Sequence, residues 1–398
     1  MKASFPLLIF FVIAGCLQAS NVTGTGNTTV FLGDSITAFG DCAGSTIANC
    51  YSWGWPAQAV FLSKGRINQV MNSGIPSDTL QQMLNRFQSD VVTFHPAKVI
   101  IAGGTNDVPN VGQSLNTIIA TASSIIDAAF NAGIQPVLCG IPPRTDSSQN
   151  IQYAATLNSS LQQLAANRAI TFVNFNSVLN NGSNGWIPGY SLPDNVHPSS
   201  QGARAMANLF ISTTAMIYSS NVWLPWVNSS GENLAGNALE LDGSSWWWSA
   251  GYGTAPAPNV SVAPGDSTLA GNWIKAVFPP ATADGQYYSF NHTNIPATDG
   301  HTYELSFRYR VTGCEANGCY MNFAYGYWGP YASYYSFDDV ADGVFHIIMQ
   351  AGVNGQLNPG FVVFPTTKAS PITVLIGQFG MRDLSQSTQQ SVVVANSN

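Results

Sequence analysis

Charged side chains are scarce in this sequence. Only 8% of its 398 residues are Asp, Glu, Lys or Arg, whereas about 25% is usual for soluble proteins. The 13 Lys and Arg residues form no cluster, and the net charge is −7. A nucleic-acid partner needs a basic stripe that neutralises phosphates, so this class of partner is excluded. Asn, Ser, Thr and Gly supply the polar surface instead, and such an uncharged surface suits neutral ligands.

The apolar run at the N-terminus is too short to cross a membrane. It extends over 13 residues from Phe5 to Leu17, after Lys2, whereas a bilayer core needs about 20. Its flanks are typical of an export signal, which predicts a signal peptide over residues 1–20. Cleavage near Ala19 would release a secreted, extracellular protein without a transmembrane span. The segment around Cys16 also resembles a bacterial lipobox, which would leave a lipid anchor there; we favour simple secretion.

Cysteine is rare, and its spacing matters more than its number. Cys42 lies close to Cys50, and Cys314 lies close to Cys319. Each pair can close a small disulfide loop, which fits an oxidising compartment. Zinc is a poor alternative because neither pair has a second Cys or His pair at the spacing of a zinc finger. Cys139 lies in an apolar run and is predicted as a buried thiol.

The first half of the chain alternates short apolar runs with longer amphipathic ones. One face of a predicted helix carries apolar residues from Leu115 to Ala129 at the i, i+3, i+4, i+7 spacing. Repeated alternation of strand and helix predicts an α/β domain over residues 28–220, with a parallel sheet covered on both faces. The predicted strands are 29–32, 67–71, 98–102, 135–140 and 170–175, and the other clear helices are 153–166 and 200–218.

Helical periodicity ends near Val222, and residues 221–230 are predicted as a linker. Beyond it, short β-type runs are separated by Gly, Pro, Asn and Asp, and residues 303–311 alternate with a period of two. We therefore predict an all-β sandwich domain over residues 231–386.

Ser35 is the candidate nucleophile. It follows Gly33 and Asp34 at the end of the first predicted strand, and ligands of open parallel sheets bind beyond the carboxyl ends of the strands. Gly-Asp-Ser alone is a common tripeptide that also serves as a helix cap. A serine hydroxyl needs an adjacent base, and Asp194 stands three residues before His197 near the end of the domain. That acid can fix the imidazole tautomer, which leaves the other ring nitrogen to accept the serine proton.

Polar groups after the next two strands are candidates for an oxyanion hole. An ester's tetrahedral intermediate carries a negative oxygen that needs fixed hydrogen-bond donors. The N–H groups of Ser35 and Gly74 and the amide of Asn106 could supply them. A glycine at position 74 would let the backbone approach the oxyanion without a side chain in the way.

These blocks together resemble the SGNH hydrolases of the GDSL esterase/lipase superfamily. The resemblance covers about half of the chain, and it implies a flavodoxin-like three-layer α/β/α fold with no metal and no organic cofactor. It also implies a catalytic triad of Ser35, His197 and Asp194, with an oxyanion hole of Ser35, Gly74 and Asn106. Ser77 departs from the pattern, because many relatives carry a second glycine there. The matching blocks are residues 33–36, 72–74, 104–107 and 194–197.

Residues 231–234 (Gly-Glu-Asn-Leu) open the β-rich half, and residues 380–384 (Gly-Met-Arg-Asp-Leu) close it. Together with three consecutive tryptophans, Trp246, Trp247 and Trp248, they loosely resemble a jelly-roll carbohydrate-binding module. Tryptophans can stack on the apolar faces of sugar rings, although aromatic residues also dominate the cores of β-sandwiches. On a strand, at least one of the three must face away from the others. We therefore expect one face to be core and the other a possible platform for sugars.

The leading interpretation is a secreted serine esterase that removes acyl groups, most simply acetyl groups, from a polysaccharide. Small esters are alternative substrates. The same blocks serve lysophospholipases, lipases, thioesterases and acyltransferases. A lipid substrate would require an apolar pocket beside Ser35, for which the candidates are Trp53, Trp55, Val60 and Phe61. These four residues fit the face of a following helix equally well. A noncatalytic glycan-binding protein would show decay in at least one block, and none is visible.

Overall fold

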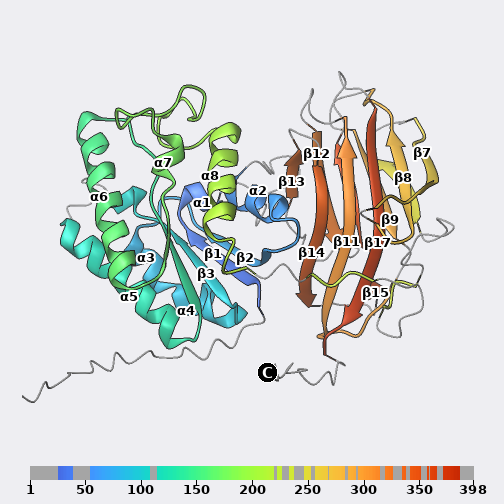
Figure 1. The fold of residues 1–398 in the computed structure, drawn as a ribbon, viewed down its shortest axis with the longest axis horizontal. Helices are drawn as coiled ribbons and strands as arrows, with labels where there is room; N and C mark the ends of the chain where they lie inside the picture. Colours follow the sequence, from blue (N-terminus) through green and yellow to red (C-terminus); the bar gives the residue numbers. More distant parts are fainter. Residues whose placement is uncertain are drawn as a thin grey trace, which may run out of the picture.

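The computed structural model describes residues 26–38, 54–107, 114–218, 222–225, 233–236, 246–251, 256–267, 269–282, 286–292, 295–313, 319–325, 334–337, 341–350, 356–357, 359–364 and 371–385. An α/β half is followed by an all-β half, and the two lie side by side (Figure 1). Within these ranges, no helix is long and apolar enough to cross a membrane. The predicted signal peptide and Cys16 lie outside them and stay predictions.

The α/β half contains a five-stranded parallel sheet in the order β2-β1-β3-β4-β5. This is the flavodoxin-like order, and it confirms the predicted fold class. The second strand continues further than predicted and includes the Asn-Ser-Gly block, while the fifth is shorter than predicted. The strands are β1 (Thr28–Gly33), β2 (Asn68–Gly74), β3 (Lys98–Ala102), β4 (Gln135–Cys139) and β5 (Thr171–Val173).

Helices cover both faces of this sheet, because successive strand residues point to opposite sides. Val30 and Leu32 pack among residues of α3 to α6, whereas Phe31 packs among residues of α2, α7 and α8. The bounds are α1 (Ser35–Ala38), α2 (Trp55–Leu62), α3 (Leu80–Asn85), α4 (Phe87–Asp90), α5 (Leu115–Asn131), α6 (Ser148–Asn167), α7 (Asn176–Leu179) and α8 (Ser200–Thr213), with short 3₁₀ turns η2 (Val92–Phe94) and η3 (Thr105–Asp107).

Capping side chains explain where the long helices begin. The Ser147 hydroxyl accepts a hydrogen bond from the N–H of Asn150, so α6 begins five residues before the predicted start at Tyr153. The last predicted helix is shorter than expected, since Thr214 ends α8 by donating both its N–H and its hydroxyl to the carbonyl of Phe210. The predicted apolar stripe of α5 is confirmed: Ile118, Ala122 and Ile125 are among its fully buried residues.

In its described residues, the all-β half has two five-stranded antiparallel sheets that pack as a sandwich, together with a short two-stranded pair, β10-β15. One sheet has the order β14-β11-β17-β8-β7 and the other β13-β12-β16-β9-β6. The strands are β6 (Trp246–Gly251), β7 (Asn259–Pro264), β8 (Asn272–Phe278), β9 (Tyr287–His292), β10 (Ile295–Pro296), β11 (Thr302–Thr312), β12 (Cys319–Tyr325), β13 (Tyr334–Phe337), β14 (Ala341–Gln350), β15 (Gln356–Leu357), β16 (Pro359–Phe364) and β17 (Ile372–Asp383).

Residues 233–234, at the start of the all-β half, pair with its last described strand, β17. The N–H of Leu234 donates to the carbonyl of Met381 at 2.7 Å, and Asn233 Oδ1 accepts the N–H of Met381 at 3.0 Å. Part of the predicted linker also contacts β17, because the carbonyl of Pro225 accepts a hydrogen bond from Gln378 Nε2 at 3.1 Å. The described linker residues 222–225 therefore pack against this half, while the predicted domain boundaries stay predictions.

The cysteines are only partly described. Cys139 is a free thiol with no exposed surface, as predicted, and burial raises its pKa well above the usual value. Cys42, Cys50 and Cys314 lie outside the described residues, and for Cys319 only the backbone, in β12, is described. Both disulfides stay predictions.

Candidate active site

Ser35 is the first residue of α1, directly after β1. The turn into this helix is tight: a Cβ on Gly33 would lie 2.6 Å from the carbonyl oxygen of Ala102, so only glycine fits there. Asp34 Oδ1 accepts the N–H of Ile36 at 2.9 Å, which fixes the turn from inside. Ser35 is thereby held at the carboxyl end of β1, as the sequence predicts.

Three predicted residues come together in one series of hydrogen bonds. Ser35 Oγ lies 2.9 Å from His197 Nε2, and His197 Nδ1 lies 2.6 Å from Asp194 Oδ2. The other oxygen of Asp194 accepts the N–H groups of Val196 and His197, each at 3.0 Å. Burial acts to raise the pKa of Asp194, but the two N–H donors and the imidazole outweigh it and lower this pKa below the usual value. Asp194 is therefore an ionised acceptor whose orientation is set by its own turn.

This turn is clamped by residues that the sequence does not reveal. Asn195 adopts a left-handed conformation with φ of 59°, which asparagine tolerates. Its carbonyl accepts hydrogen bonds from Trp186 Nε1 at 3.0 Å and from the N–H of Thr145 at 3.3 Å. Trp186 is itself buried. No motif points to Trp186 or Thr145, because both act through tertiary contacts.

The predicted oxyanion donors differ in whether their hydrogens already have an acceptor within the protein. Asn106 lies in η3, and its Nδ2 donates to the carbonyl of Asp78 at 3.0 Å, which leaves a second amide hydrogen. No residue in the described part of the chain accepts the N–H of Ser35. The N–H of Gly74, by contrast, already donates to Asn72 Oδ1 at 3.0 Å. A Cβ at Gly74 would lie 2.2 Å from the N atom of Ala38, so close packing against α1 is sufficient reason for a glycine.

Ser77, where the resemblance leads us to expect a glycine, has a left-handed backbone with φ of 70°. This conformation favours glycine. Among the described residues none accepts the N–H of Ser77. The turn that carries it continues into Asp78, whose carbonyl holds the Asn106 amide. Ser77 is thus a candidate donor that the sequence alone would not place at the site.

Part of the chain is similar to a known protein family. Residues 31–205 match the model of the GDSL-like Lipase/Acylhydrolase family. We call these residues the GDSL-like domain. The predicted resemblance is therefore confirmed over residues 31–205, and a domain of this family implies hydrolase activity. Among curated proteins, none matches this sequence.

Solved structures are similar to about half of this chain. A GDSL-like lipase from Bacteroides thetaiotaomicron is 24% identical, covers 48% of this chain and 88% of its own, and has a TM-score of 0.40. A lipase/acylhydrolase from Enterococcus faecalis is 19% identical, covers 50% and 100%, and has a TM-score of 0.41. An acetyl xylan esterase from Geobacillus stearothermophilus is 22% identical, covers 50% and 100%, and has a TM-score of 0.42.

Two further carboxyl groups of the GDSL-like domain lie close to the site. Asp34 is fully buried, and desolvation raises its pKa to about 7, although the N–H of Ile36 opposes the shift. Asp107, on η3, accepts the N–H of Leu80 with both oxygens, and its pKa is also raised by burial. Within the described residues, no three His, Cys, Asp or Glu side chains cluster as they would around a metal ion.

Of the four candidates for an acyl pocket, Trp55 and Val60 are core residues of helix α2, whereas Trp53 and the side chain of Phe61 lie outside the described part of the chain. Trp55 has no exposed surface, and its ring lies 5.3 Å from Phe31 and 4.8 Å from Phe175 between centroids. The sequence left two roles open for these residues: the lining of an acyl pocket or the buried face of a helix. In the structure, Trp55 and Val60 lie on the buried face of α2.

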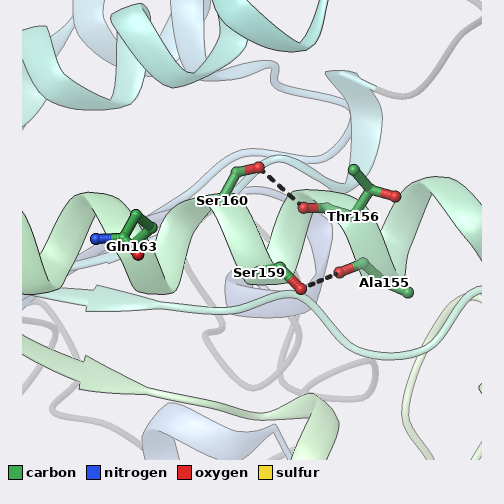
Figure 2. Close-up of a pocket in the computed structure, with 5 residues that line it drawn as sticks. All are labelled: Ala155, Thr156, Ser159, Ser160 and Gln163. Atoms are coloured by element: carbon green, nitrogen blue, oxygen red, sulfur yellow. Dashed lines mark hydrogen bonds between the residues drawn. The ribbon is translucent and has the colours of Figure 1, made fainter.

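One depression in the described part of the surface lies away from Ser35. It lies on the outer face of α6 and is lined by Ala155, Thr156, Ser159, Ser160 and Gln163 (Figure 2). The hydroxyls of Ser159 and Ser160 donate to the carbonyls of Ala155 and Thr156 within the helix itself. They are therefore committed to their own backbone, and we assign no function to this surface.

The three consecutive tryptophans divide between two faces, as expected. Trp246 is buried, with its ring stacked on Phe290 at 5.0 Å and set edge-on to Phe379 of the opposite sheet at 5.2 Å. It is a core residue and unavailable to a ligand. Trp248 points to the same side of β6 but is less buried, with 36% of its surface exposed. Trp247 faces outward and is 41% exposed.

Proposed function

We propose that this chain is a secreted serine esterase that hydrolyses O-acyl esters, specifically O-acetyl groups on a polysaccharide. The observation that carries the proposal is the hydrogen-bonded series from Ser35 Oγ through His197 to Asp194, at 2.9 and 2.6 Å. A hydroxyl, an imidazole and an ionised carboxylate in this order are the parts of a Ser-His-Asp triad. The GDSL-like family of the domain supports the same class of reaction.

In the proposed reaction, Ser35 Oγ attacks the ester carbonyl carbon while His197 Nε2 accepts its proton. The tetrahedral intermediate then collapses, the bond to the alcohol oxygen breaks, and His197 returns the proton to that oxygen. A water molecule attacks the acyl-enzyme and gives a proton to His197. The acid is released as Ser35 regains its proton. Throughout the reaction, Asp194 accepts a hydrogen bond from the Nδ1–H of His197, which keeps that proton on Nδ1.

The negative oxygen of each tetrahedral intermediate would be bound by the N–H of Ser35 and by the free amide hydrogen of Asn106. A third donor would come from the turn after β2. Gly74 is the donor expected from the sequence, but its N–H would first have to leave Asn72 Oδ1. The N–H of Ser77 needs no such exchange, and we therefore propose it as the third donor.

The second half would hold the polysaccharide through the outward face of β6 and β9. Trp247 pairs in register with Asn291, and the next pair on the same face is Ser249 with Ser289. An exposed indole beside amide and hydroxyl groups suits a neutral sugar, whose ring faces are apolar and whose edges carry hydroxyls. The scarcity of charge in the chain supports the same substrate class.

Hydrolysis of a chromogenic acetyl ester, acetylated xylan and acetylated pectin tests the catalytic proposal. We expect the wild type to release acetate from at least one polymer and Ser35→Ala to lose that activity. Equal activity of the two proteins, or no activity of the wild type on any ester, would contradict it. Sugar binding is tested on the full chain by retention on insoluble polysaccharides. Trp247→Ala should reduce retention, whereas Phe94→Ala, which removes a similarly exposed ring (40%) from the first half, should not.

A further inference from the structure

Arg86 lies between α3 and α4, and its guanidinium binds three different parts of the GDSL-like domain. Nε donates to Asp78 Oδ2 at 2.7 Å, Nη1 donates to Asp90 Oδ2 at 2.7 Å, and Nη2 donates to the carbonyl of Gly33 at 2.9 Å. The Arg86 side chain is only 13% exposed. Each of its three nitrogens thus has an acceptor, and the group is fixed in one orientation.

Two of these acceptors continue directly into the candidate active site. Gly33 ends β1, and its carbonyl lies two residues before the nucleophile Ser35. Asp78 presents its carboxylate to Arg86 and its backbone carbonyl to Asn106 Nδ2, at 3.0 Å. One side chain therefore connects the turn that carries the nucleophile to the residue that anchors the oxyanion amide.

We propose that Arg86 is a positioning residue for ester hydrolysis, which sets the separation between Ser35 and the Asn106 amide. The inference rests on the proposed function, although Arg86 itself touches no reacting atom. An oxyanion forms on the carbon that Ser35 attacks, so the Asn106 donor must lie about 2.7–3.1 Å from that oxygen. A planar guanidinium fork holds two acceptors at a fixed angle, which a flexible lysine ammonium cannot do.

The test compares kcat and KM for a chromogenic acetyl ester in variants of the full chain. Arg86→Gln should lower kcat by about 10- to 100-fold, because a misplacement of about 1 Å can cost that much. KM should change by less than about threefold, since Arg86 contributes nothing to ground-state binding. Arg86→Lys should fall between wild type and Arg86→Gln, because the ammonium reaches one acceptor but not both.

A double-mutant cycle with Asp78 tests whether Arg86 acts on Asn106 through Asp78. Asp78→Asn retains the carbonyl that holds Asn106 but weakens the contact with the fork, so its kcat should fall by a similar factor. The double variant with Arg86→Gln should be no slower than Arg86→Gln alone, since both changes break one connection.

A control variant separates positioning from the general loss of an ion pair. Arg168→Gln removes an arginine that pairs with Asp127 on α5 and has no contact with Arg86 or its acceptors. It should keep kcat within about twofold of wild type. Melting temperatures are measured for every variant, and kinetics are recorded well below the lowest of them.

The outcomes distinguish this inference from the proposed function. A wild type without Ser35-dependent hydrolysis would overturn both. A wild type that hydrolyses the ester, together with folded Arg86 and Asp78 variants whose kcat is unchanged, would overturn the role of Arg86 alone. If Arg86→Gln fails to fold, Arg86→Lys and Asp78→Asn decide the question by the same criterion.

Discussion

Asp194→Asn should remove most of the activity while it preserves the shape of the site. Asp194 Oδ1 accepts two backbone N–H groups, and Oδ2 faces His197 Nδ1 at 2.6 Å. In the variant, the amide oxygen must stay toward the two N–H donors, because an NH₂ group there would face them without an acceptor. The NH₂ group therefore points at Nδ1 and donates to it. The ring proton then resides on Nε2, which faces Ser35 and can no longer accept the serine proton.

The size of the loss follows from the exposure of the carboxylate. An amide in place of the acid costs about 10⁴-fold in kcat when the acid of a triad is buried. The Asp194 side chain is 46% exposed, so water competes for Nδ1 and weakens the tautomer preference. We therefore expect a loss of about 10²- to 10³-fold, smaller than in the buried case.

Steady-state hydrolysis of a chromogenic acetyl ester near pH 8 measures this loss. Asp127→Asn is the matched control, because Asp127 is similarly exposed (53%) and also ion-paired, but with Arg168 on the surface of the same domain. The control should retain its activity. A folded Asp194→Asn protein with activity within about tenfold of wild type would refute the tautomer argument.

Three further predictions concern stability. Because burial raises the pKa of Asp34 to about 7 from 3.8, the folded protein keeps a proton that the unfolded chain releases, and stability falls as pH rises through this window. Asp34→Asn removes this dependence, so its melting temperature relative to wild type should rise between about pH 5 and 8; a constant difference would contradict the assigned pKa. Trp55→Ala should cost about 3–5 kcal/mol in denaturant unfolding, because the buried ring leaves a cavity among Phe31 and Phe175; a loss below about 1 kcal/mol would mean that Trp55 is not core. Ser77→Gly should raise the free energy of unfolding by up to about 1 kcal/mol, because relief of left-handed strain exceeds the entropy cost of glycine. A clear decrease of that free energy in the same assay would show that this turn is unstrained.

The arrangement of the parallel sheet could be predicted because strands and reactive blocks alternate regularly. Ser35 and Asn106 each follow a short apolar run, and the carboxyl ends of parallel strands meet at one edge of the sheet. His197 could be added because its acid lies three residues earlier. These contacts are encoded locally, by the order of blocks and by spacing within one turn.

Other features depend on tertiary contacts that no local pattern specifies. The clamp of Trp186 on Asn195 joins two loops, and the competition of Asn72 for the Gly74 N–H depends on how one side chain folds back. Alternation predicts that one tryptophan of the 246–248 run faces outward. That it is Trp247 follows only from the register with β9 and from the packing of Trp246 on Phe379.

Covalent labelling of the nucleophile tests the central claim most directly. The full chain is incubated with a fluorophosphonate, which reacts with activated serine hydroxyls, and the modified residue is located by peptide mass spectrometry. The account predicts a single adduct on Ser35, absent from Ser35→Ala and strongly slowed in His197→Ala. An adduct on another serine, or labelling of Ser35 at an unchanged rate without His197, would contradict it.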